Sequence, residues 1–155
     1  MTDLLVRLYD LPAFDTGPLV NAGVTIRRPL APELHIVLDW TGAHFAKGWV
    51  AEASVALHQQ PPTIFIAVRD REILGFACYD ATARGFFGPT GVAEAARGKR
   101  VGSALLFATL RAMREAGYGY AVIGGVGPVE FYRRQLDVLE IPDSTPGLYA
   151  GLLGS

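Results

Sequence analysis

The chain has 155 residues, 50% of them hydrophobic and 19% charged, with a formal net charge of −1. This length and composition suit one globular domain with a substantial core, and they exclude the strongly basic surface of most nucleic-acid-binding proteins. The apolar runs are too short or too interrupted to span a bilayer, the first residues lack a secretion signal, and the single cysteine, Cys78, excludes an internal disulfide. We therefore expect a cytoplasmic protein with no membrane and no nucleic-acid partner.

The N-terminal part of the chain predicts one strand and two helices. An apolar run at residues 4–8 is followed by an alternating segment at 24–28, which predicts a strand. The segment after Pro32 predicts a helix, with a strand at 35–38 as the alternative, because short apolar runs are ambiguous by periodicity. A second helix is predicted at 49–58.

The middle of the chain predicts a hairpin and a third strand. The segments 64–68 and 73–79 are rich in β-branched and aromatic residues and flank a polar turn. The next strand is predicted at 85–92. Pro89 has no backbone donor, so we expect a bulge or an unpaired edge within that strand.

The C-terminal part predicts alternating helices and strands. A helix at 102–116 has an apolar stripe that leaves Ser103 on the solvent side. A strand at 118–126 and a helix at 131–136 follow, before a turn-rich tail. The glycine-rich run at 124–127 lacks the G-x-G-x-x-G spacing of a dinucleotide-binding loop and is interpreted as a flexible strand end.

The turn between the strand at 85–92 and the helix at 102–116 carries the most chemical information. Free N–H groups at the positive end of a helix dipole can bind phosphate. The Gly-Lys-Ser/Thr ending of a Walker loop is absent. The residues of this turn that could offer backbone N–H groups or charge to a phosphate are Arg97, Gly98, Lys99, Arg100, Val101, Gly102 and Ser103.

The segment Arg97-Gly98-Lys99-Arg100-Val101-Gly102, five residues beyond Val92, resembles the acetyl-CoA loop Gln/Arg-x-x-Gly-x-Gly/Ala of the GNAT N-acetyltransferase family. The pair Phe131-Tyr132 resembles a second landmark, the Phe-Tyr pair that opens the last helix in many members. The resemblance implies a single domain over residues 1–155 with an α/β (α+β) fold, in which helices flank a central mixed, largely antiparallel twisted sheet. Residues 1–61 would form the variable acceptor-side part and residues 62–149 the acetyl-CoA-binding core.

The resemblance also implies a reaction, the direct transfer of an acetyl group from acetyl-CoA to a primary amine. Thr90, Gly91 and Val92 match the strand whose backbone pairs with pantetheine, and Tyr132 matches the tyrosine proposed to protonate the departing thiolate. Arg100 occupies a position that is usually glycine, where its side chain could crowd the pyrophosphate or reach the 3′-phosphate.

A general base is also needed, because the attacking amine must be neutral. Asp39, His44, Glu52 and Glu94 are the candidates. Glu52 is the first choice, because the second helix of the family fold usually borders the acceptor site. The three histidines and Cys78 lack the spacing of metal ligands, so no metal is predicted.

Two other functions are compatible with the sequence, a non-catalytic acyl-CoA-binding sensor and a protein-interaction domain with the same fold. The apolar tail at 148–153 favours the second, and a strand in the tail could also form a homodimer, as in many relatives. The acceptor stays open between a small-molecule amine, such as a polyamine, amino sugar or antibiotic, and a peptide amine.

Overall fold

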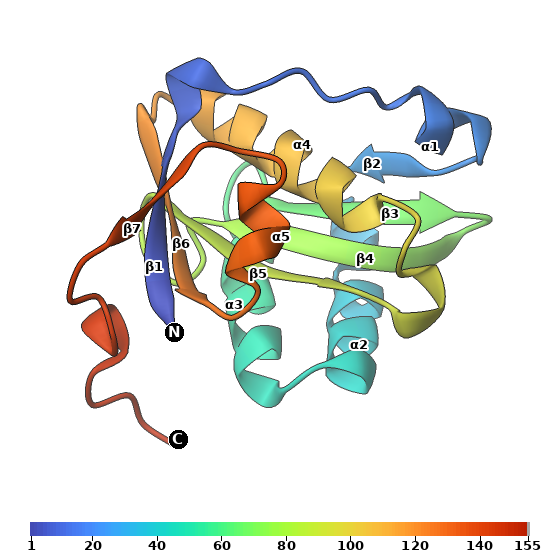
Figure 1. Ribbon diagram of the computed structural model, residues 1–155. Helices are drawn as coiled ribbons and strands as arrows, with labels where there is room; N and C mark the ends of the chain where they lie inside the picture. The colour runs from blue at the N-terminus through green and yellow to red at the C-terminus, as the bar shows by residue number, and fades with distance from the viewer. Residues whose placement is uncertain (155) are drawn as a thin grey trace.

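The computed structural model describes residues 1–154, in which one sheet carries helices on both faces (Figure 1). The strands are β1 (Thr2–Arg7), β2 (Thr25–Arg27), β3 (Ile64–Arg69), β4 (Glu72–Tyr79), β5 (Phe86–Val92), β6 (Tyr120–Val126) and β7 (Val138–Ile141). The helices are α1 (Gly17–Asn21), α2 (Leu34–His44), α3 (Lys47–Leu57), α4 (Val101–Glu115) and α5 (Val129–Arg133). Short 3-10 turns lie at Leu8–Asp10, Ala31–Glu33, Glu94–Ala96 and Gly147–Tyr149.

The sheet has the strand order β2-β3-β4-β5-β6-β1-β7. Every neighbouring pair is antiparallel except β5 and β6, which run parallel. A parallel pair needs a crossover connection, and α4 supplies it between β5 and β6. The predicted mixed, largely antiparallel sheet with flanking helices is therefore confirmed.

The segment after Pro32 forms helix α2, not the alternative strand. Val37 and Thr41 are four residues apart and fully buried, which is the spacing of one helical face. The carboxylate of Glu33 accepts the Leu30 N–H at 2.8 Å just before the helix and pairs with the Arg27 guanidinium at 2.7 Å. The hydrogen bond from Arg27 lowers the pKa of Glu33 to about 2, so the carboxylate stays ionised at neutral pH.

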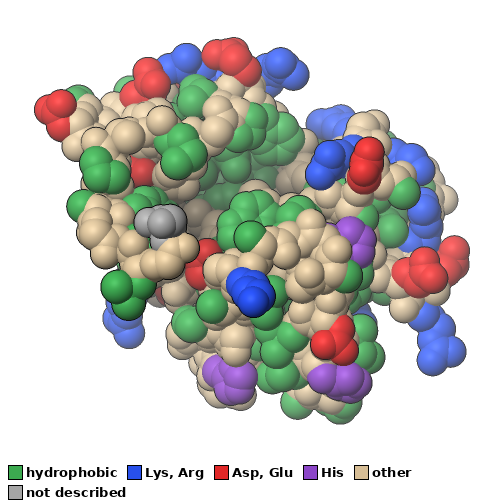
Figure 2. All heavy atoms as spheres, turned by 90° about the horizontal axis from the view of Figure 1, so that it is seen from below, with side chains coloured by type: hydrophobic (Ala, Val, Ile, Leu, Met, Phe, Trp, Pro, Cys, Tyr) green, Lys and Arg blue, Asp and Glu red, His purple; other side chains and the backbone are tan. Residues whose placement is uncertain are grey.

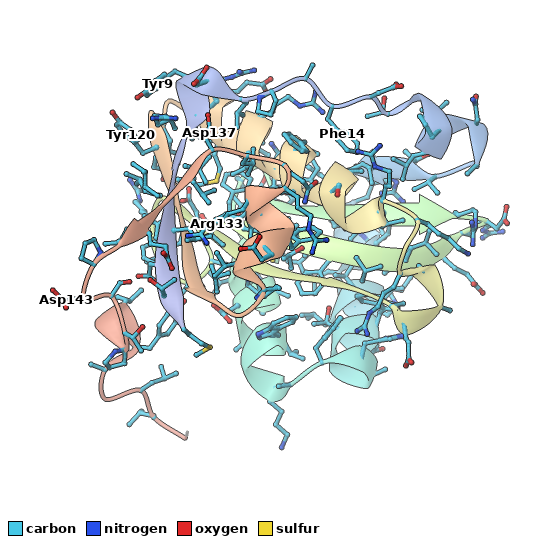
Figure 3. The ribbon with its side chains drawn as sticks, viewed as in Figure 1. Tyr9, Phe14, Tyr120, Arg133, Asp137 and Asp143 are labelled. Carbon is cyan, nitrogen blue, oxygen red and sulfur yellow. The ribbon has the colours of Figure 1, made fainter. Side chains whose placement is uncertain are left out.

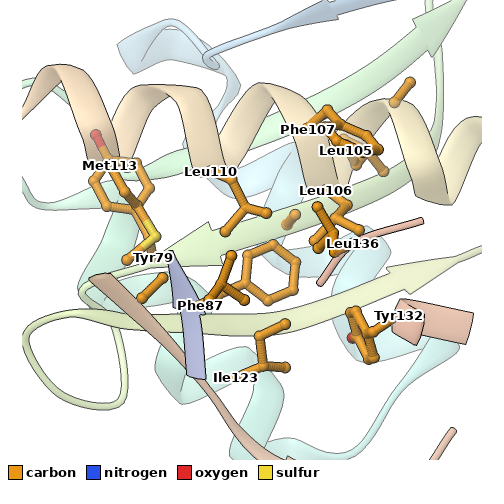
Figure 4. Packing of buried hydrophobic residues seen from close by; sticks show 14 of the residues in the cluster. Tyr79, Phe87, Leu105, Leu106, Phe107, Leu110, Met113, Ile123, Tyr132 and Leu136 are labelled. Carbon is orange, nitrogen blue, oxygen red and sulfur yellow. The ribbon is translucent and has the colours of Figure 1, made fainter. Parts of the chain in front are cut away.

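Helix α4 covers one face of the sheet, and α2 and α3 cover the other (Figure 1). Under α4, the side chains of Leu106 and Leu110 pack with Phe87 of β5 in the larger of two hydrophobic clusters (Figure 4). The expectation that Ser103 faces solvent is wrong, because this residue is only 8% exposed. The buried face of α4 is thus wider than its sequence pattern indicated.

The apolar run at residues 4–8 supplies β1, which lies between β6 and β7 in the sheet. Leu4 and Val6 are buried, and Leu4 is opposite Ile123 of β6 on one side and Glu140 of β7 on the other. The first strand of the chain therefore joins its last two strands. Without β1, β7 would lose its strand partner, and β6 would keep only its short pairing with β5.

Asp3 secures β1 at an irregular point of its pairing with β6. The register shifts between residues 2 and 4 of β1, and the Asp3 carboxylate accepts the N–H of Gly125 at 2.8 Å. The Asp3 N–H donates to the Ser144 hydroxyl at 2.9 Å, and that hydroxyl donates to the Ile141 carbonyl. Asp3 thereby links β1 to β6 and to the segment after β7.

We expect Asp3→Ala to lower the free energy of unfolding by about 1–3 kcal/mol, because it leaves the Gly125 N–H without its acceptor. Asp3→Asn keeps an acceptor oxygen and should cost less. The measurement is urea denaturation, with Asp137→Ala as the control, since the Asp137 side chain is 87% exposed. Equal losses for Asp3→Ala and Asp137→Ala would contradict this role of Asp3.

Candidate active site

The site begins where β5 and β6 separate. The two strands pair only at Phe86 with Val122 and at Phe87 with Ile123. On its other side β5 continues along β4, but residues 88 and 89 lie opposite the single residue Cys78, which is a β-bulge. The bulge expected near Pro89 is therefore confirmed. The bend it introduces accompanies the opening between β5 and β6.

A cavity of about 890 Å³ fills this opening. The face seen from below is hollowed, and hydrophobic side chains line the hollow (Figure 2). The lining residues come from both separated strands, both terminal segments and three helices: Met1, Trp49, Glu52, Thr82, Phe87, Gly88, Pro89, Thr90, Gly91, Val92, Arg97, Gly102, Leu106, Ile123, Gly124, Gly125, Val126, Gly127, Pro128, Phe131, Tyr132, Tyr149 and Leu152.

The basic turn forms the end of the cavity at the start of α4. The first helical hydrogen bond runs from the Ala104 N–H to the Arg100 carbonyl, so the three N–H groups of residues 101–103 precede it. Gly102 lines the cavity, and Arg97 also lines it while its Nε donates to the Val92 carbonyl at 3.3 Å. The turn therefore combines a helix N-terminus and one guanidinium, an arrangement suited to an anion.

Arg100 points away from this cavity. Its backbone is left-handed, with φ of 64°, which explains why glycine would suit the position. Its guanidinium lies 5.0 Å from the centre of the Phe14 ring, and Phe14 stacks in turn on Phe107 of α4 (Figure 3). Lys99, Arg100 and Val101 line a separate cavity of about 190 Å³.

The structure thus divides the predicted cofactor-binding residues. Five of them line the large cavity: Thr90, Gly91, Val92, Arg97 and Gly102. Three line the small cavity: Lys99, Arg100 and Val101. Gly98 and Ser103 line neither, although Gly98, with φ of 78°, shapes the turn.

The β5 residues present backbone to the cavity because their side chains are small or turned aside. The Thr90 hydroxyl donates to the Phe76 carbonyl of β4 at 3.1 Å. At Gly91, a Cβ atom would come within 2.4 Å of the Phe45 ring. Glycine is therefore required here for the close approach of Phe45, a residue of the link between α2 and α3.

Tyr132 reaches the cavity from α5 and is 5% exposed. Its ring packs edge-on against Phe87 of β5, with ring centres 6.4 Å apart, and against Phe131. Burial raises the pKa of Tyr132 to about 12. The phenol is therefore protonated at neutral pH and can act as a proton donor.

Of the four candidate bases, only Glu52 lines the large cavity. It projects from α3 and accepts a hydrogen bond from the Thr82 hydroxyl. Asp39, His44 and Glu94 are exposed and line neither cavity, and the His44 ring donates to the Trp40 carbonyl within its own helix. The structure therefore places Glu52 and Tyr132 on the same cavity and leaves out the other three.

Sequence reasoning missed the glycine run of β6 and the tail that packs on it. At Gly124, a Cβ atom would lie 2.7 Å from the Tyr149 hydroxyl and 3.0 Å from the Phe86 ring. The run thus forms a wall of the cavity. Because its glycines have no side chains, two aromatic rings can pack against the backbone. The repeated glycines were the available signal, but their meaning depended on contacts from distant residues.

Among residues 1–154, no group of three or more His, Cys, Asp or Glu side chains could hold a metal ion. Cys78 is fully buried, and burial together with the charge of Glu52 raises the pKa of its thiol. Within the same described range, no helix has the length and apolar character needed to cross a membrane.

Solved structures support the fold. A glucosamine N-acetyltransferase region of a fungal multi-domain β-N-acetylglucosaminidase matches 90% of this chain and 20% of its own, at 14% identity and a TM-score of 0.74. A related N-acetyltransferase from Sphaerobacter thermophilus matches 90% of this chain and 48% of its own, at 18% identity and a TM-score of 0.67. This chain therefore spans half or less of either protein. A GNAT acetyltransferase from Brucella melitensis, solved with acetyl-CoA, matches 77% of this chain and 96% of its own, at 21% identity and a TM-score of 0.54.

A comparison with curated proteins finds no match. The model of the acetyltransferase (GNAT) family matches residues 32–136, more than half of the chain. This range includes the bulged strand β5, the basic turn, α4 and Tyr132. The sequence match and the sheet with its separated parallel strands lead to the same conclusion: the chain belongs to the GNAT acetyltransferase family.

Proposed function

We propose that the protein transfers an acetyl group from acetyl-CoA directly to a primary amine. The observation that carries this proposal is that one cavity joins the basic turn, the open edge of β5, Tyr132 and Glu52. A donor group and an acceptor could therefore bind in the cavity that both proton-transfer residues line. Holding reactants together in this way supplies much of the rate gain in such a reaction.

The cavity suits an acyl-CoA in charge and shape. Arg97 and the amide of Gly102 would bind the pyrophosphate, and the backbone of β5 from Thr90 to Val92 would pair with the amide-bearing arm. The orientation of Arg100 toward Phe14 supports this assignment, because the side chain at the usual glycine position leaves the cavity free. Gly98 and Ser103 would then shape the turn, and Lys99, Arg100 and Val101 would support it from the other side.

The reaction requires two proton transfers. The nitrogen of the neutral amine attacks the thioester carbonyl carbon, so that the N–C bond forms and the C–S bond breaks. Glu52, directly or through a water molecule, would take the proton that the amine nitrogen loses. Tyr132 would give a proton to the departing thiolate, and its raised pKa keeps it in the required neutral form.

The non-catalytic sensor is the weaker proposal. A sensor needs an anion-binding site and an apolar channel for the ligand. It does not need a carboxylate and a buried phenol that line the same cavity. Glu52 and Tyr132 come from α3 and α5, elements far apart in the chain, and both line this cavity. Their convergence favours the enzyme.

Calorimetric titration with acetyl-CoA tests the first half of the proposal. We expect binding in the micromolar range, and Gly102→Glu should weaken it by about 100-fold, because a carboxylate at the helix start repels phosphate and fills the cavity. Gly48→Glu is the control, since nothing lies within 4 Å of its Cβ position and Gly48 lines neither cavity. Failure of the unmodified protein to bind acetyl-CoA at millimolar concentration would exclude the transferase.

Tyr132→Phe tests the second half. We expect turnover to fall about 10-fold or more, because the thiolate loses its proton donor, while acetyl-CoA affinity changes less than about twofold. The readout is thiol release under saturating acetyl-CoA, together with calorimetry on the same variant. Unchanged turnover would remove the assigned role of Tyr132.

The pH profile offers a second check on the same residue. Because the pKa of Tyr132 is raised to about 12, the phenol remains protonated throughout the range from about pH 6 to about pH 10. Turnover should therefore rise or stay level toward alkaline pH and show no falling limb below about pH 10. A falling limb near pH 8 would indicate a different acid.

A further inference from the structure

The cavity continues past the start of β5 into a region bounded by α3 and the C-terminal tail. Trp49 and Glu52 enter it from α3, and Thr82 from the connection between β4 and β5. Tyr149 and Leu152 close it from the tail. Thr82 precedes β5 and Arg97 follows it, so this region lies at the opposite end of β5 from the basic turn.

This region has a single acidic side chain in its lining. Among the described residues that line the large cavity, Glu52 has the one acidic side chain and Arg97 the one basic side chain. The hydrogen bond from Arg97 to the Val92 carbonyl holds this guanidinium at the end of the cavity near the basic turn, away from Glu52. A ligand that bears one ammonium group would therefore be balanced here, whereas a further positive charge would find no second acidic side chain in the lining.

The remaining walls are mostly apolar and aromatic. Trp49 packs against the rings of Phe45 and Phe76, with centres 4.9 and 6.0 Å away. Tyr149 lies against the bare backbone of Gly124 and Gly125. Such walls bind an apolar body and offer few hydrogen-bond partners to one with many hydroxyl groups.

The polar groups at this end are few and already engaged. The Thr82 hydroxyl donates to Glu52. Burial is the main cause that raises the pKa of Tyr149, and the negative charges of Glu52 and Asp3 contribute further. This phenol is therefore uncharged at neutral pH. It adds a ring and one hydroxyl to the wall without adding charge.

We propose that the acceptor is a primary amine with one positive charge and a compact apolar body, and that Tyr149 is a specificity-determining residue for it. This inference rests on the acetyl transfer proposed above. The ammonium group would lie at Glu52 and release one proton to solvent to become the neutral amine, and Glu52 would take the second proton when the N–C bond forms. The apolar body would lie between Trp49 and Tyr149. Polyamines would carry surplus charge into this region, and amino sugars would place hydroxyl groups against aromatic walls.

The test is thiol release from acetyl-CoA with four amines. They are 2-phenylethylamine, ethanolamine with the same charge but no apolar body, spermidine with more charge, and glucosamine with many hydroxyl groups. We expect kcat/KM for 2-phenylethylamine to exceed each of the others by about 10-fold or more, because only this amine combines one charge with a buried apolar body.

Tyr149→Ala separates the specificity role from the chemistry. It should raise KM for 2-phenylethylamine about 10-fold while KM for acetyl-CoA and for ethanolamine changes less than about twofold, because only the wall for the apolar body is lost. Tyr149→Phe keeps the ring and should keep the selectivity. The matched control is Tyr120→Ala, an exposed tyrosine that contacts Tyr9 and lines neither cavity (Figure 3).

The outcomes distinguish the two levels of proposal. Faster turnover with spermidine or glucosamine would overturn the acceptor class and leave the transferase intact. An unchanged preference in Tyr149→Ala would overturn the role of Tyr149 alone. Absence of thiol release with all four amines, despite acetyl-CoA binding, would overturn the acceptor class, whereas absence of acetyl-CoA binding itself would overturn the transferase.

Discussion

The limited pairing of β5 with β6 is the constraint on which the rest of the molecule depends. Two residue pairs hold the parallel strands together, and beyond them the chain must provide other partners for the backbone. The Arg97 side chain supplies one at the Val92 carbonyl of β5. On the other side of β6, Asp3 of β1 binds the Gly125 N–H at the irregular point of the β1–β6 pairing. Polar side chains therefore bind backbone groups of both strands beyond the point where the strands separate.

The position of α4 follows from the same constraint. As the crossover between two parallel strands, it must start beside the end of β5, and its N-terminus then faces the opening. Arg100 can hold the left-handed backbone of this start because its guanidinium rests on Phe14, outside the cavity. The N-terminal connection that carries Phe14 thus supports the basic turn from behind, although it lines no part of the large cavity.

The sequence predicted those features that depend on local pattern. The β3–β4 hairpin, helix α4, the bulge at Pro89 and the basic turn all have signals within a few residues, and each was found. The place of β1, the burial of Ser103 and the contact of Tyr149 with Gly124 were not predicted. They depend on contacts between residues that are distant in the chain. The hydrophobic periodicity of a strand or a helix, two or 3.6 residues, carries no information about such contacts. For the same reason, the elements with local signals were predictable from one sequence, whereas the end of the cavity lined by Trp49 and Tyr149 required the structure.

The location of β1 has a consequence for how the chain reaches its native state. Leu4 is synthesised early, yet it can pair only after Ile123 and Glu140 have been made. Until then the apolar side chains of β1 have no place to be buried, and the partly made chain exposes them. Such long-range pairing slows folding and raises contact order. The β2–β5 half of the sheet can thus assemble during translation, whereas the half that includes β1, β6 and β7 must await the synthesis of residues 120–141.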